Sequence, residues 1–222
     1  MALMSKGLRP GLYAITDSRL TPPSTLVEAI EAALRGGAVM VQYREKAATS
    51  TERLAQARDL QALCHNAGVP LLINDDPELA RRVGAAGVHL GQTDATLSTA
   101  RQLLGEQAII GITCHADLAL AEAAMRGGAD YLAFGRFHAS TTKPGAPLAS
   151  PDVLAQAKPW GYPLTAIGGI TLDNGGALIR AGADRLAVIG GLFEGTPAQI
   201  EARANAFQRL FASHHPLFES SR

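Results

Sequence analysis

Short apolar runs recur along the chain, and each lies between a step that contains glycine and a polar or glycine-rich step. The clearest copies are LRGGAVMVQYR at Leu34–Arg44, RRVGAAGVHLGQ at Arg81–Gln92, AMRGGADYLAFG at Ala124–Gly135 and IRAGADRLAVIG at Ile179–Gly190. In each copy the glycine predicts a helix end in the left-handed conformation, and the apolar residues after it predict a buried parallel strand. The pattern therefore predicts a recurring joint between a helix and a strand.

Further strand-like runs lie between these copies, and amphipathic helical stretches separate the strands. The additional strands are predicted at Leu12–Thr16, Leu71–Asn74, Ile109–Thr113 and Leu164–Ile167. The predicted helices include Thr25–Arg35, Thr51–Ala67, Leu118–Arg126 and Pro197–Phe211. The chain therefore alternates strictly between strand and helix.

This alternation predicts an α/β fold, a single (β/α)8 TIM barrel. At about 28 residues per strand–helix unit, the units use the whole chain with little left over, which suits a compact barrel. A doubly wound open sheet is the alternative, but it would leave the repeated double unit unexplained. We expect one domain over residues 1–222, with frayed ends at 1–9 and 213–222.

Charge and composition exclude several classes of protein. Lys plus Arg and Asp plus Glu are balanced at 20 each, so no excess positive charge is present to bind nucleic acid or an anionic membrane. The longest apolar runs are only a few residues, and the N-terminal segment lacks the apolar core of a signal peptide. Cys64 and Cys114 lack the spacing of a zinc site or a disulfide framework. We therefore expect a cytoplasmic protein whose partners are small molecules.

Polar side chains after the second strand predict an anion site. The loops that follow parallel barrel strands converge on one mouth, where chemistry takes place. Gln42, Arg44 and Lys46 alternate along an extended segment, so their side chains share one face. Arginine forks onto paired oxygens and lysine acts as a point charge, which suits a polyphosphate. The alternative is a solvated strand end held by salt bridges.

Two carboxylates end consecutive strands and predict a metal site. Asp75 and Asp94 can approach each other at the rim, where two acids repel unless a cation lies between them. Mg²⁺ usually takes one or two carboxylates together with phosphate oxygens and water. Asp76 is different, because its place before Pro77 at a helix start predicts a cap rather than a ligand. A Mg²⁺-diphosphate site is the resulting hypothesis.

Glycines follow the last two strands, at Gly168–Ile170 and Ile189–Gly191. These are positions where many barrels bind a phosphate through backbone N–H groups, and glycine permits that close approach. Tight turns are the alternative explanation. His89 alternates with apolar neighbours and points either into the barrel or toward a helix, more in keeping with a structural than a functional histidine.

Taken together, the polar segments resemble the thiamine phosphate synthase family in order and spacing from about Gly11 to Phe193. The matching segments are YAITD at Tyr13–Asp17, VQYREK at Val41–Lys46, LINDDPELA at Leu71–Ala80, GVHLGQTD at Gly87–Asp94, GITCH at Gly111–His115, FGRFHASTTKPG at Phe134–Gly145 and AIGGI at Ala166–Ile170. AIGGI alone is common among phosphate-binding barrels, but the combination is specific. The resemblance implies an enzyme that joins a hydroxymethylpyrimidine diphosphate to a thiazole phosphate with Mg²⁺, giving thiamine phosphate and pyrophosphate.

The resemblance also implies roles for individual residues. The diphosphate would be held by Gln42, Arg44, Lys46, Asn74 and Lys143, and Mg²⁺ by Asp75 and Asp94. Thr113 would face the pyrimidine, and Tyr43 and Glu45 belong to the same pyrimidine diphosphate segment. The thiazole phosphate would be held by Ser140, Thr142, Gly169, Ile189 and Gly190, with Thr141 in the same loop. Arg44, Lys46, Lys143 and Thr113 are the expected catalytic residues.

Some residues depart from the commonest family pattern. Thr113 stands where serine is usual, Ser140 where threonine is usual, and Ile189-Gly190 where Val-Ser is usual. Arg136 and His138 stand where proline and an aromatic residue are frequent.

Several alternatives stay open on the sequence. The rivals to the synthase are a thiazole tautomerase and a non-catalytic barrel that binds thiazole or thiamine phosphate. The thiazole substrate could be plain or carboxylated, and the chain could form a homo-oligomer. The Ser-, Thr-, Pro- and Gly-rich segment Ala139–Leu148 is the candidate lid over the site.

Overall fold

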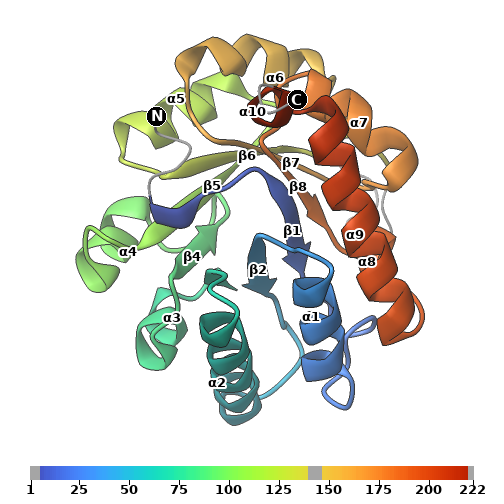
Figure 1. The fold of residues 1–222 in the computed structure, drawn as a ribbon. Helices are drawn as coiled ribbons and strands as arrows, with labels where there is room; N and C mark the ends of the chain where they lie inside the picture. The colour runs from blue at the N-terminus through green and yellow to red at the C-terminus, as the bar shows by residue number, and fades with distance from the viewer. Residues whose placement is uncertain (1–5, 140–146, 220–222) are drawn as a thin grey trace.

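The computed structural model describes residues 6–139 and 147–219, and its strands form a closed barrel (Figure 1). All eight strands are parallel and follow one another in chain order, and β1 pairs with β8 to close the barrel. The strands are β1 (Gly11–Ile15), β2 (Met40–Tyr43), β3 (Leu71–Asn74), β4 (Gly87–Leu90), β5 (Ile109–His115), β6 (Tyr131–Gly135), β7 (Leu164–Ile167) and β8 (Arg185–Val188). The predicted (β/α)8 barrel is confirmed, and the open sheet is excluded by this closure.

Helices surround the strands on the outside of the barrel (Figure 1). They are α1 (Leu26–Arg35), α2 (Ser50–Asn66), α3 (Pro77–Val83), α4 (Leu97–Leu104), α5 (Leu118–Arg126), α6 (Asp152–Ala157), the 3₁₀ helix η2 (Lys158–Trp160), α7 (Leu172–Arg180), α8 (Gly190–Phe193), α9 (Pro197–His214) and α10 (Pro216–Glu219). None of the helices in the described part of the chain is long and apolar enough to span a membrane.

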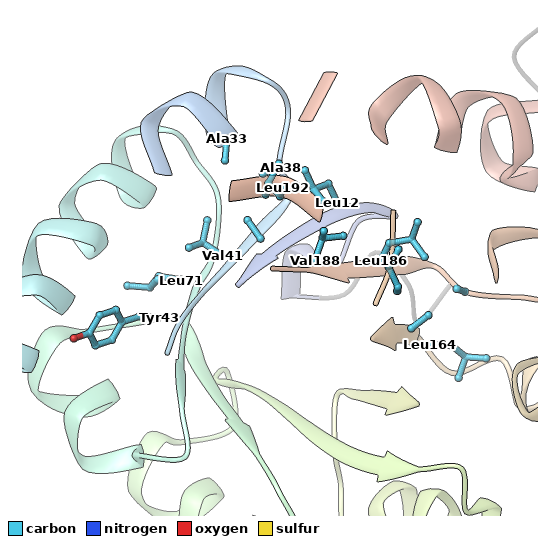
Figure 2. Packing of buried hydrophobic residues seen from close by; sticks show 14 of the residues in the cluster. Leu12, Ala33, Ala38, Val41, Tyr43, Leu71, Leu164, Leu186, Val188 and Leu192 are labelled. Atoms are coloured by element: carbon cyan, nitrogen blue, oxygen red, sulfur yellow. The ribbon is translucent and has the colours of Figure 1, made fainter. Parts of the chain in front are cut away.

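The larger apolar core lies between the strands and the helices, because alternate strand residues point outward (Figure 2). Leu12, Val41, Leu71 and Leu186 are each at most 1% exposed in this layer. Tyr43 belongs to the same outer layer, and its hydroxyl donates a hydrogen bond to Gln56 Oε1 on α2 at 2.8 Å. Outward-pointing residues thus attach the helices and are unavailable to the barrel interior.

The remaining strand residues point inward and fill the barrel with a second, smaller cluster. Its members are Leu8, Tyr13, Ile15, Met40, Leu72, Ile109, Tyr131, Ala133 and Ala187. Leu8 precedes β1 and is fully buried, so it packs against these side chains from the N-terminal end of the strands. The barrel is therefore a packed core below its mouth.

The described parts of both chain ends, residues 6–9 and 213–219, make contacts with the barrel. Lys6 pairs with Asp130 at 2.7 Å, just before β6. His215 is 2% exposed, and its Nε2 lies 3.1 Å from Asp184 Oδ1, just before β8. Both ends are thus held by carboxylates that precede strands, and such long-range contacts leave no local signal in the sequence.

The predicted glycine caps need a correction of one position. In the two Gly-Gly copies the first glycine keeps a helical φ, −74° at Gly36 and −76° at Gly127. The second glycine turns left-handed, with φ of 94° at Gly37 and 84° at Gly128. The chain therefore extends one residue farther before it turns into the strand. In the two copies with one glycine, Gly84 caps its helix with φ of 67°, and Gly182 directly follows its helix cap with φ of 122°, both left-handed as predicted.

Asp184 generates a prediction about stability. It is fully buried and accepts hydrogen bonds from Lys158 Nζ at 2.9 Å and the Leu164 N–H at 2.8 Å, besides its contact with His215. Burial alone would raise the pKa of Asp184, but these donors outweigh it and hold the pKa below its ordinary value. The stabilisation is therefore complete above the ordinary carboxyl pKa of about 3.9, and it is lost as pH falls through the lower folded value.

We expect Asp184→Asn to lower the free energy of unfolding at pH 7 by about 3 kcal/mol, because it leaves buried donors without their anion. The matched control is Glu31→Gln, which breaks an exposed ion pair with Arg35 and should cost under about 0.5 kcal/mol. Urea unfolding from pH 7 to pH 3 measures both effects. An Asp184→Asn loss no larger than that of Glu31→Gln would contradict this account.

Candidate active site

The barrel mouth collects the inward side chains at the C-terminal ends of the strands. Gln42 is 2% exposed near the end of β2, where it pairs in register with Leu72 of the inner cluster. Asn74 ends β3 in register with His89 on β4, so the two side chains share the inner face. Thr113, half-buried on β5, belongs to the same face. The structure thus places Gln42, Asn74 and Thr113 on the inner face, near the C-terminal ends of their strands.

Arg44 follows β2 and is held by the segment that follows β1. Its N–H donates to Thr16 Oγ1 at 2.8 Å, and that hydroxyl donates back to the Arg44 carbonyl at 3.2 Å. Its guanidinium Nη1 lies 3.8 Å from Asp17 Oδ2, and both side chains are largely buried. Thr16 and Asp17 therefore orient a cation at the mouth. Their only signal in the sequence is a hydroxyl and a carboxylate directly after the first strand.

Lys46, Asp75 and Asp94 form a charged group at the rim. Lys46 Nζ lies 3.3 Å from Asp75 Oδ2, and Asp94 accepts a hydrogen bond from the Gly91 N–H at 2.7 Å. Burial raises the pKa of Asp94, and a hydrogen bond shared with the Asp75 carboxyl raises it further. Two carboxyls that share a hydrogen bond repel when both are ionised, so their closeness favours a cation between them.

These carboxylates fit the donor set of Mg²⁺, which prefers oxygen ligands and keeps part of its shell for substrate phosphate and water. No third His, Cys, Asp or Glu of the described residues joins the pair in a group of metal-binding size. Asp75 has a left-handed φ of 63°, a conformation that costs energy for a residue with a side chain. A cleft of about 540 Å³ lies beside Asp75 and is also lined by Glu45, Lys46 and Asn74, among others.

A second group of backbone donors lies after β7 and β8. Gly168 and Gly169 both have left-handed φ values, 103° and 63°, so the chain turns sharply there. Ile189 is the N-cap of α8, which leaves the N–H of Gly190 in the first turn, where helical partners are lacking. A Cβ at Gly190 would meet nothing closer than Glu194 Oε1 at 3.8 Å. The space above Gly190 is therefore open, as a phosphate would require.

Two residues of the predicted substrate segment do not reach the mouth. Tyr43 points outward into the helix layer, because it alternates with the inward Gln42. Glu45 turns back on its own loop, where its Oε1 accepts from the N–H groups of Ala47 and Ala48. The strand alternation that brings Gln42 and Arg44 inward thus excludes the side chains between them.

Other predicted residues have simpler outcomes. Asp76 caps α3 by accepting from the Leu79 N–H at 2.9 Å, so the prediction of a cap is confirmed. His89 points into the barrel and is 7% exposed. The strand-6 loop residues Ser140, Thr141, Thr142 and Lys143 lie outside the described residues, as does most of the predicted lid at Ala139–Leu148.

Comparisons with known proteins show the family to which the chain is similar. The family model described as thiamine monophosphate synthase matches residues 12–192. A thiamine-phosphate synthase from Marinobacter nauticus is 67% identical over 221 residues, covering 100% of both chains. A solved thiamine phosphate pyrophosphorylase from Pyrococcus furiosus has a TM-score of 0.83 at 29% identity, covering 95% of this chain and 98% of that one.

The solved thiamine phosphate pyrophosphorylase from Bacteroides thetaiotaomicron shares the fold, with a TM-score of 0.69 at 14% identity over 92% of this chain and 99% of its own. The family model spans β1 to α8, the elements that carry every described residue of the mouth. The chain therefore belongs to the thiamine monophosphate synthase family.

Proposed function

We propose that this enzyme condenses 4-amino-2-methyl-5-hydroxymethylpyrimidine diphosphate with 4-methyl-5-(2-hydroxyethyl)thiazole phosphate, giving thiamine phosphate and pyrophosphate. The observation that carries the proposal is the charged group at the rim. Lys46 lies beside Asp75, which is paired with Asp94, and Arg44 follows the same strand as Lys46 and is held by Asp17. This arrangement suits a metal-bound diphosphate. Membership of the family, with a relative of 67% identity, supports the same reaction.

The reaction needs a leaving group that departs and a nucleophile that is already aligned. The bond between the pyrimidine methylene carbon and the diphosphate oxygen breaks, and the thiazole nitrogen then donates its electron pair to that carbon. When bound at Asp75 and Asp94, Mg²⁺ would supply positive charge to the departing diphosphate. Arg44 opposes the same growing charge from a guanidinium that Thr16 and Asp17 keep in place.

Alignment of the two substrates supplies much of the remaining rate. Well-oriented partners avoid about 7–11 kcal/mol of the barrier that free reactants would meet. The thiazole phosphate is placed by the backbone of Gly169, Ile189 and Gly190, across the mouth from the diphosphate group. Lys143, Ser140 and Thr142 complete the two subsites in this proposal, on the strength of the family resemblance. Carboxylated thiazole phosphate is an alternative second substrate.

The proposal makes small molecules the partners of a cytoplasmic enzyme, in keeping with the balanced charge of the chain. A thiazole tautomerase needs neither a diphosphate nor a metal, so the pairing of Asp75 with Asp94 favours the synthase. Incubation with both substrates and Mg²⁺, followed by assay of thiamine phosphate and pyrophosphate, tests the choice directly. Isomerisation of the thiazole without coupling would identify the tautomerase, and binding without turnover would identify a non-catalytic barrel.

Asp75→Asn and Asp94→Asn should each lower turnover by about two orders of magnitude, because each removes a charged metal ligand. Asparagine preserves the shape of the side chain and tolerates the left-handed backbone at Asp75. The control is Asp76→Asn, which neutralises the neighbouring carboxylate that caps α3. This variant should keep the coupling activity of the parent enzyme, because asparagine caps helices as well as aspartate does. Coupling rates measured against Mg²⁺ concentration, and after chelation, distinguish the outcomes. Full activity without the metal would contradict the assignment.

Gly190 should separate the two subsites. Gly190→Asp fits the open space but sets a carboxylate against the phosphate, so the KM for thiazole phosphate should rise at least about tenfold. Gly190→Ser is a smaller, neutral control and should stay within about threefold of the parent enzyme. The KM for the pyrimidine diphosphate should change in neither variant. The reverse pattern in Gly190→Asp would mean that the two substrates occupy opposite sides.

A further inference from the structure

A chain of hydrogen bonds crosses the barrel interior below the mouth. Gln42 Nε2 donates to the Tyr13 hydroxyl at 2.6 Å, and that hydroxyl lies 3.0 Å from the Tyr131 hydroxyl. Tyr131 in turn lies 2.8 Å from Nδ1 of His89, whose Nε2 lies 2.9 Å from Thr113 Oγ1. The chain therefore joins two mouth residues, Gln42 and Thr113, through side chains that the reaction proposed above does not use.

The two tyrosines in the middle of this hydrogen-bond network are inaccessible to water. Tyr131 is fully buried and Tyr13 is 1% exposed. Burial raises the pKa of Tyr13 to about 12 and that of Tyr131 well above its ordinary value, so both hydroxyls keep their protons. Each tyrosine hydroxyl then has one hydrogen to donate, so the number of hydrogens determines which group donates in each hydrogen bond of the network.

The backbone of β5 is shaped to let Tyr131 reach His89. Gly111 lies between them in register, and a Cβ there would overlap the ring and hydroxyl of Tyr131. The His89 and Tyr131 rings stack with centroids 5.6 Å apart and an interplanar angle of 19°. The guanidinium carbon of Arg185 lies 5.2 Å from the centroid of the same Tyr131 ring. Three neighbours therefore hold this ring in one position.

The available hydrogens determine which group donates in each hydrogen bond from Gln42 to Thr113. The Tyr13 oxygen accepts from Gln42, and its own buried hydrogen needs an acceptor, for which the Tyr131 hydroxyl lies within hydrogen-bond distance. The Tyr131 hydrogen then goes to Nδ1 of His89. His89 then carries its hydrogen on Nε2 and donates it to Thr113. The Thr113 oxygen is thus an acceptor on its inner side, and its own hydrogen is left to point toward the mouth.

We propose that Tyr131 is a positioning residue which, through His89, makes the Thr113 hydroxyl a hydrogen-bond donor to a ring nitrogen of the pyrimidine substrate. The inference rests on the proposed function, because it concerns the recognition of the pyrimidine in that reaction. Without the Tyr131 hydroxyl, His89 can move its hydrogen to Nδ1 and accept the Thr113 hydrogen on Nε2. Thr113 would then present only lone pairs to a ring nitrogen, which also carries a lone pair.

The first test is Tyr131→Phe, which removes the hydroxyl and keeps the ring. We expect the KM for the pyrimidine diphosphate to rise about tenfold, the effect of one misdirected hydrogen bond. The KM for thiazole phosphate and inhibition by inorganic pyrophosphate, which lacks the ring, should stay within about twofold. Tyr162→Phe is the matched control, because its hydroxyl donates to the Ala129 carbonyl outside the barrel interior. Equal rises in both KM values would overturn the proposal.

A double-mutant cycle separates positioning from general loosening of the core. Thr113→Val should raise the same KM about tenfold, and the Tyr131→Phe/Thr113→Val double variant should be no worse than Thr113→Val alone. Additive effects of about a hundredfold would mean that Tyr131 acts independently of Thr113, which would refute the relay.

His89 offers a second route if Tyr131→Phe does not fold. His89→Leu should reproduce the selective rise in KM, and His89→Gln should restore most of the affinity, because an amide can accept from Tyr131 and donate to Thr113. Equal affinities in the two His89 variants would contradict the relay. Persistence of Mg²⁺-dependent coupling in these variants would show that the proposed function itself stands, whereas absence of coupling in the unaltered enzyme would defeat both.

Discussion

The alternation of side chains along closed, parallel strands is the constraint on which this molecule depends. Once β1 pairs with β8, no strand can slip by one residue without turning its inner face outward. Tyr43 therefore attaches α2 while Gln42 and Arg44 serve the mouth, although the three are consecutive. Successive residues of one strand therefore alternate between packing against a helix and lining the mouth.

The same constraint explains why the fold was readable in the sequence. Parallel strands covered by helices on one side and by a packed interior on the other are apolar along most of their length, and Leu71–Asn74 and Leu164–Ile167 were predicted with the observed bounds. The contacts made by the described ends of the chain leave no pattern in the sequence, because their partners are distant along it. His215 is polar and near a terminus, and only the position of Asp184 explains its burial.

The site was predicted where its chemistry follows a strand directly and missed where it depends on a neighbouring strand. Gln42, Asn74 and Thr113 lie on the inner face at the mouth, since each lies near the C-terminal end of its strand. Asp17 has no pattern that links it to Arg44, because the contact joins different loops. Tyr13 and Tyr131 have the sequence pattern of ordinary core residues, and only the structure shows that their hydroxyls are hydrogen-bonded to each other and to His89.

The anchoring of both chain ends has a practical consequence for handling the protein. Asp130 and Asp184 directly precede β6 and β8, so Lys6 and His215 are held at the N-terminal ends of the strands, opposite the mouth. Attachment to a surface, fusion to a carrier or tandem linkage through either end would leave the substrate entrance facing solvent. Linkers should begin outside these two contacts, so that immobilisation preserves the carboxylates that hold the two ends of the chain to the barrel.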